Sequence, residues 1–124
     1  MTSAILVVDD DPQVLEVVGE MLRLEGYDVA TAADGREAVA KFRTTPFDLV
    51  ITDLIMPEQE GLETITSLKK EYPGIKIIAI SGGGRIGPEA YLPAAQELGA
   101  DKVFSKPFDV RELAETVKEL LSHE

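Results

Sequence analysis

The chain contains no cysteine, and its single histidine, His123, is the next-to-last of 124 residues. The absence of cysteine excludes a disulfide framework, a thiol nucleophile and zinc held by thiolates. We expect His123 to be frayed, so the folded body offers no imidazole for general-base catalysis, metal binding or phosphoryl carriage. Serine–histidine catalysis is therefore excluded, and so is the possibility that this chain is itself a phosphohistidine relay domain.

Long hydrophobic runs and basic residues are also scarce. No apolar run approaches the roughly 20 residues that span a bilayer, and no basic region precedes the first one, so we expect neither a membrane span nor a signal peptide. Only 12 Lys and Arg residues stand against 23 Asp and Glu, which gives a formal net charge of −11. Nucleic-acid binding relies on cations that neutralise phosphates, so we expect no direct nucleic-acid partner. A cytoplasmic protein is the default expectation.

The length fits one domain over residues 1–124. Apolar, β-branched runs alternate with helical patterns, without long linkers or internal repeats. Strands are predicted at about 4–8, 28–32, 47–52, 75–80 and 101–105, and helices at about 12–25, 35–44, 60–72, 89–98 and 109–122. The alternation predicts an α/β fold, in which helices cover both faces of a parallel sheet. It does not predict the order of the strands.

Residues that begin and end helices stand between these segments. Asp11, followed by Pro12, and Asp109 are expected to cap the helices that follow them. Gly26 and Gly99 stand where a helix ends with a residue of positive φ.

Polar side chains follow four of the predicted strands at the point where each strand ends. These residues are Asp9 and Asp10 after the first strand, Asp53 after the third, Ser81 after the fourth and Lys106 after the fifth. The carboxyl ends of parallel strands meet at the edge where open α/β sheets bind ligands, so we expect these side chains to lie together. Clustered carboxylates repel unless a cation lies among them, and an all-oxygen ligand set suits Mg²⁺. The sequence therefore predicts a site for a divalent metal and a phosphoryl group.

The motifs around these residues resemble, over essentially the whole chain, the receiver domains of two-component response regulators. The matching motifs are Ile5-Leu-Val-Val-Asp-Asp10, Asp53-Leu-Ile-Met-Pro57 with Gly61, Ser81-Gly82 and Lys106-Pro-Phe108. Any one of them alone is weak, but all four together are highly specific. The resemblance implies a flavodoxin-like, doubly wound sheet of five parallel strands in the order 2-1-3-4-5. In that order the first and third strands are neighbours.

The resemblance also implies which residues hold the metal. Asp10 and Asp53 would bind Mg²⁺ directly, and Asp9 would act through a water molecule. The backbone carbonyl of Ile55 would complete the protein ligands. Asp11 is placed outside this set, because the family's acidic pair follows the strand immediately and Asp11 is the expected helix cap.

The same resemblance implies how the chain works as a switch. Asp53 would be the phospho-acceptor, Ser81 would donate a hydrogen bond to the phosphoryl group, and Lys106 would neutralise its charge. The phosphoryl group would come from a sensor histidine kinase or a phosphotransfer protein. A conformational change in residues 81–104 would then control a partner or output. Family members often pair through their fourth and fifth helices, so a homodimer on phosphorylation is one possibility.

Two features depart from the common family pattern. Val103 stands three residues before the lysine, where many receivers carry a Tyr or Phe that changes rotamer on activation. Phe104 is one place along and is expected to face the opposite side of the sheet. The stretch from Ser81 to Gly99 is a few residues longer than usual, and Pro93 within it predicts an irregular fourth helix.

Three other interpretations of the sequence compete with a phosphorylated receiver. The run Asp9-Asp10-Asp11 contains the D-x-D of haloacid-dehalogenase-like phosphatases, although Gln13 stands where their Thr or Val belongs. The segment 82–87 matches the dinucleotide fingerprint, but no acidic residue ends the next strand. A receiver-like interaction module that is not phosphorylated remains open because of Val103 and the long loop.

Overall fold

The computed structural model of the protein describes residues 3–53, 61–81, 99–105 and 108–122. Its five strands form one parallel sheet in the order β2-β1-β3-β4-β5. The strands are β1 (Ala4–Val8), β2 (Asp28–Ala32), β3 (Leu49–Asp53), β4 (Lys76–Ser81) and β5 (Lys102–Ser105). The described helices are α1 (Pro12–Leu24), α2 (Gly35–Thr44), α3 (Gly61–Glu71) and α5 (Val110–Leu121). The predicted α/β fold and the strand order 2-1-3-4-5 are confirmed.

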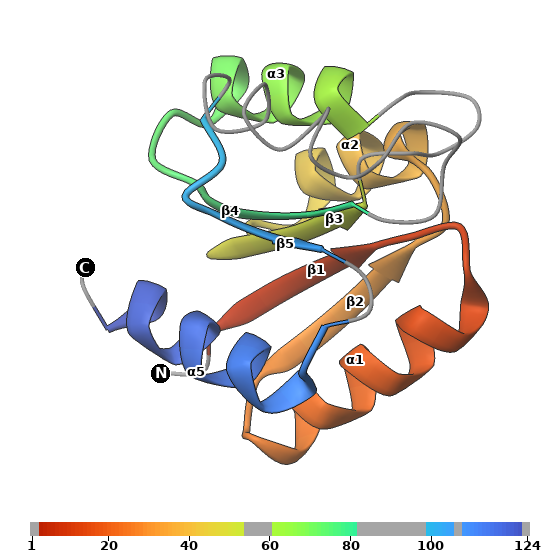
Figure 1. The fold of residues 1–124 in the computed structure, drawn as a ribbon. Helices are drawn as coiled ribbons and strands as arrows, with labels where there is room; N and C mark the ends of the chain where they lie inside the picture. The colour runs from red at the N-terminus through yellow and green to blue at the C-terminus, as the bar shows by residue number, and fades with distance from the viewer. Residues whose placement is uncertain (1–2, 54–60, 82–98, 106–107, 123–124) are drawn as a thin grey trace.

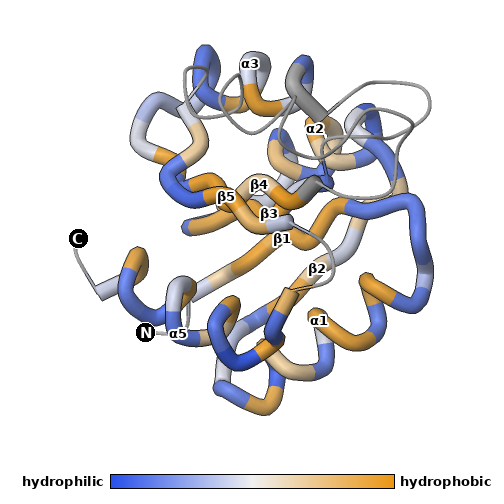
Figure 2. Tube along the Cα trace, in the orientation of Figure 1, coloured by the Kyte–Doolittle hydropathy of each residue, from blue (hydrophilic) through white to orange (hydrophobic). Residues whose placement is uncertain are grey.

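Helices cover both faces of the sheet (Figure 1). Helices α2 and α3 lie over one face, and α1 and α5 lie over the other. The central strands β1, β3 and β4 are mostly hydrophobic, whereas polar residues recur along the described helices (Figure 2). Within the described residues, no helix is long and apolar enough to cross a membrane.

The core is divided by the sheet into two apolar clusters. Val50 of β3 packs with Ile65 of α3 in one cluster, and Ile51 packs with Leu113 of α5 in the other. Successive residues of a strand point to opposite faces, so β3 serves both clusters and is buried along its whole length. The last residue of this strand, Asp53, is therefore attached to a tightly packed part of the core.

The predicted helix caps are present. The side chain of Asp11 accepts a hydrogen bond from the backbone N–H of Gln13 at 2.9 Å, and Pro12 begins α1. The side chain of Asp109 accepts one from the backbone N–H of Arg111 at 2.8 Å. Each cap satisfies a backbone donor that the helix itself leaves unpaired.

Most predicted boundaries hold within one residue, but the third strand, predicted at 47–52, runs from Leu49 to Asp53. Just before its start, the carboxylate of Asp48 accepts a hydrogen bond from the backbone N–H of Ala4 at 2.8 Å, in place of a strand pairing. It ends late because Asp53 still pairs with Ile80 of β4. The predicted fourth helix, 89–98, lies outside the described residues.

Gly26 and Gly99 have positive φ angles of +97° and +121°, as predicted. A β-carbon at Gly99 would lie 2.8 Å from Cγ of Lys69, whereas a β-carbon at Gly26 would meet nothing within 4 Å. The Lys69 side chain is held in place, because its Nζ donates a hydrogen bond to the backbone carbonyl of Ile75 at 2.8 Å. Gly99 therefore allows α3 to pack closely against the start of β5.

We expect Gly99→Ala to lower the free energy of unfolding by more than Gly26→Ala does. Both substitutions force alanine into a left-handed backbone conformation, at a cost of about 1–2 kcal/mol. Only Gly99→Ala also displaces the Lys69 side chain. Urea unfolding of both variants measures the difference. Equal losses would show that Lys69 moves aside at no cost.

Candidate metal and phosphoryl site

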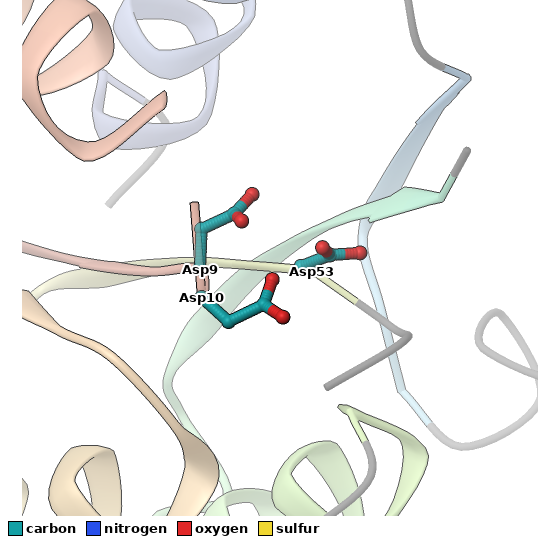
Figure 3. Close-up of side chains that lie close together, drawn as sticks. All are labelled: Asp9, Asp10 and Asp53. Carbon is teal, nitrogen blue, oxygen red and sulfur yellow. The ribbon is translucent and has the colours of Figure 1, made fainter. Parts of the chain in front are cut away.

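Three acidic side chains meet at the carboxyl edge of the sheet. Asp9 and Asp10 directly follow β1, and Asp53 is the last residue of β3. The two strands are neighbours in the sheet, with Val8 paired to Thr52. One carboxylate oxygen from each aspartate lies within 4.8 Å of the others (Figure 3). The fold therefore joins positions that are more than forty residues apart in the sequence.

The three carboxylates differ in their surroundings. Asp9 is 1% exposed and Asp53 is 4% exposed, whereas Asp10 is open to solvent. One carboxylate oxygen of Asp9 accepts the backbone N–H of Asp11 at 2.9 Å. The Asp11 carboxylate caps α1, in agreement with its predicted place outside the metal ligands. The cluster is thus buried on one side and accessible on the other.

The electrostatics of this cluster favour a bound cation. Like charges at this separation repel one another, and they do so more strongly where burial reduces screening by water. Among the described residues, the cluster offers carboxylate oxygens, without sulfur or imidazole. Such a set fits a hard ion such as Mg²⁺, which binds through one or two carboxylates and keeps several waters. The accessible side at Asp10 leaves space for those waters.

The remaining predicted site residues are described only in part. Ser81 is the last residue of β4 and pairs with Ser105 of β5, so its backbone lies at the same edge of the sheet. Its side chain is not described, and Ile55 and Lys106 lie outside the described residues. Their roles remain predictions.

Strand β5 carries the departure from the family pattern. Val103 packs with the cluster on the α2 and α3 face, and Phe104 packs with the cluster on the α1 and α5 face. The prediction that these two side chains face opposite sides is confirmed. The Phe104 ring lies 6.4 Å, centroid to centroid, from that of Phe108. The position of the usual aromatic switch therefore holds a partly buried valine that packs against the core.

One residue beside the acidic cluster was missed by the sequence reasoning. Thr52 precedes Asp53, is 0% exposed, and its hydroxyl donates a hydrogen bond to the backbone carbonyl of Asp53 at 3.0 Å. Threonine is common in strands, so a threonine in β3 does not by itself indicate a functional role. The available signal was a single hydroxyl in the apolar run Leu49-Val-Ile-Thr52, directly before the acidic residue.

Comparison with known families agrees with this geometry. Residues 5–118 match the family described as response regulator receiver domain. The chain is 32% identical over 117 residues to the probable transcriptional regulatory protein TcrX of Mycobacterium tuberculosis, covering 94% of this chain and 49% of TcrX. It is 35% identical over 121 residues to the alkaline phosphatase synthesis transcriptional regulatory protein PhoP of Bacillus subtilis, covering 98% of this chain and 49% of PhoP. The chain thus spans about half the length of these relatives.

Solved structures share the fold over almost the whole chain. A CheY-like response regulator receiver domain protein from Methanospirillum hungatei superposes with a TM-score of 0.91 at 34% identity, covering 98% of this chain and 95% of that one. The chemotaxis response regulator CheY4 of Vibrio cholerae gives a TM-score of 0.85 at 31% identity, covering 97% and 99%.

Proposed function

Because this chain belongs to the family of response regulator receiver domains of two-component systems, we propose that it is a phosphorylation-dependent switch with Asp53 as phospho-acceptor. The observation that carries the proposal is the convergence of the Asp9, Asp10 and Asp53 carboxylates within 4.8 Å at one edge of the sheet. Asp53 projects from a fully buried central strand, which holds a nucleophile in a defined direction.

In the proposed reaction the Asp53 carboxylate is the nucleophile. One of its oxygens forms a bond to phosphorus, while the bond from phosphorus to the imidazole nitrogen of a donor's phosphohistidine breaks. The imidazole leaves with the electron pair and is then protonated, and Asp53 carries an acyl phosphate. Most of the catalysis is positioning and electrostatic stabilisation. By resemblance, Ser81 would donate a hydrogen bond to the phosphoryl group, and Lys106 would neutralise part of its charge.

Mg²⁺ is the cofactor of this proposal. Asp10 and Asp53 would bind it directly, Asp9 would bind through a water, and the Ile55 carbonyl would complete the protein ligands. When bound, the metal supplies positive charge that stabilises the phosphoryl oxygens. The hydrogen bond from the backbone N–H of Asp11 keeps the buried Asp9 carboxylate oriented at the cluster.

We propose a sensor histidine kinase or a phosphotransfer protein as the phosphodonor, since the sequence holds no histidine except His123. Residues 1–124 would act as one receiver domain in the cytoplasm, and a change in residues 81–104 would carry the signal to a partner or output. TcrX and PhoP are named transcriptional regulatory proteins, and this chain covers about half of each. A transcriptional output by a segment or protein other than these 124 residues fits the proposal. A homodimer formed on phosphorylation fits it as well.

The test is intact mass measurement after incubation with Mg²⁺ and acetyl phosphate, a small phosphodonor. We expect one labile phosphoryl adduct on the native chain, and none on Asp53→Ala or after chelation of the metal. An adduct that persists on Asp53→Ala would place the acceptor elsewhere. A native chain without any adduct would favour an interaction module that is not phosphorylated.

A further inference from the structure

Thr52 is a buried polar residue in an otherwise apolar position. Its strand register places it between Val8 of β1 and Ala79 of β4. Both neighbours belong to the apolar cluster on the α2 and α3 face, and Thr52 itself is 0% exposed. A valine of nearly the same volume would avoid the cost of burying a hydroxyl, which is substantial unless the group is hydrogen-bonded. A buried hydroxyl at this position therefore indicates a specific hydrogen bond.

The hydrogen-bond partner of the Thr52 hydroxyl is the backbone of the proposed phospho-acceptor. Oγ1 of Thr52 donates to the backbone carbonyl of Asp53 at 3.0 Å. Asp53 is the last residue of β3, and its pairing with Ile80 restrains it through the sheet. The residue at a strand end is prone to fray, because the ladder no longer continues beyond it. The Thr52 hydroxyl adds a restraint at the backbone carbonyl of Asp53.

We propose that Thr52 is a positioning residue, which holds the Asp53 carboxylate in the orientation that Mg²⁺ binding and phosphoryl acceptance require. The inference rests on the proposed function of Asp53. The pairing of Asp53 with Ile80 and the Thr52 hydroxyl together restrain the backbone of Asp53, and this restraint favours one direction of its side chain, toward the oxygens of Asp10 and Asp9. Groups that orient a metal ligand in this way typically affect metal affinity or activity by about 10–100-fold.

The test compares Thr52→Val with Thr52→Ser, which keeps the hydroxyl, and with Thr31→Val as the matched control. Thr31 is also a strand threonine, on β2, which is separated from β3 by β1, and it pairs with Val7 of β1. Mg²⁺ affinity is measured by calorimetry without phosphodonor, and the rate of adduct formation is measured with acetyl phosphate. We expect Thr52→Val to weaken Mg²⁺ binding and slow adduct formation by about tenfold each. Thr52→Ser and Thr31→Val should stay near the native values.

Native Mg²⁺ affinity and native rate in Thr52→Val would overturn the proposal, even if its melting temperature fell, since the hydroxyl would then be structural only. If Thr52→Val does not fold, Mg²⁺ affinity and the rate of adduct formation are measured for Thr52→Ala instead, and the same criteria apply. A native chain that binds Mg²⁺ but forms no adduct contradicts the proposed phosphoryl acceptance, while the calorimetry still decides the role of Thr52. A native chain that does neither overturns both proposals.

Discussion

Without divalent metal, Asp53→Asn is expected to melt at a higher temperature than the native chain, although it removes the proposed phospho-acceptor. The carboxylates of Asp9, Asp10 and Asp53 lie within 4.8 Å of one another, and Asp53 is 4% exposed. Two unit charges at such a distance repel by about 1 kcal/mol in water and by about 3–4 kcal/mol at the effective dielectric near a protein surface. Replacing Asp53 with its neutral near-isostere removes part of this repulsion, so we expect a gain of about 1–3 kcal/mol.

Mg²⁺ should offset that difference. A ligand at 100 times its Kd stabilises the folded state by about 2.7 kcal/mol. We expect the free energy of unfolding of the native chain to increase by this amount when Mg²⁺ is present at that excess. Asp53→Asn lacks one proposed ligand and should respond weakly. The measurement is thermal unfolding in chelator and across a Mg²⁺ titration, with Asp28→Asn on β2 as the control of equal charge change. If Mg²⁺ raises the melting temperatures of native and Asp53→Asn proteins equally, the metal binds elsewhere.

The second large effect concerns two adjacent aspartates with different roles. Asp10→Asn is expected to slow adduct formation with acetyl phosphate by about 100-fold or more, the size of effect seen when a group that stabilises transition-state charge is removed. Asp11→Asn should stay within about twofold of the native rate, because the Asp11 carboxylate caps α1 and asparagine caps a helix equally well. Both changes remove one negative charge from the same loop.

The pair of variants therefore separates metal ligation from the net charge of the loop. The rates are compared at one fixed Mg²⁺ concentration, after circular dichroism has shown that both variants are folded. An equal loss of rate in the two variants would mean that loop charge alone matters. A native rate in Asp10→Asn would remove this residue from the proposed ligands.

The features that follow from short-range physics were predictable from the sequence. The caps Asp11 and Asp109 were identified by their position before apolar helical patterns, and both accept the expected backbone N–H groups. Gly26 and Gly99 were assigned positive φ because only glycine adopts such angles without strain. These features depend on a few neighbouring residues, so the local sequence contains the information that determines them.

The order of the strands could not be predicted from local sequence patterns. Alternating strands and helices predict a parallel sheet but leave open which strands are neighbours, and the order 2-1-3-4-5 came from resemblance to a family. The adjacency of β1 and β3 is what brings Asp53 to Asp9 and Asp10. It depends on packing between segments far apart in the chain, which no local pattern contains.

The amino-acid sequence was enough to predict the fold class, the helix caps and the set of acidic residues from which a metal site is built. Two features became visible only in the folded chain: Asp53 ends a strand rather than following one, and the Thr52 hydroxyl holds the Asp53 carbonyl. The role of Thr52 depends on its burial. Whether a threonine is an ordinary strand residue or a restraint on its neighbour depends on what surrounds it, and those surroundings come from β1 and β4.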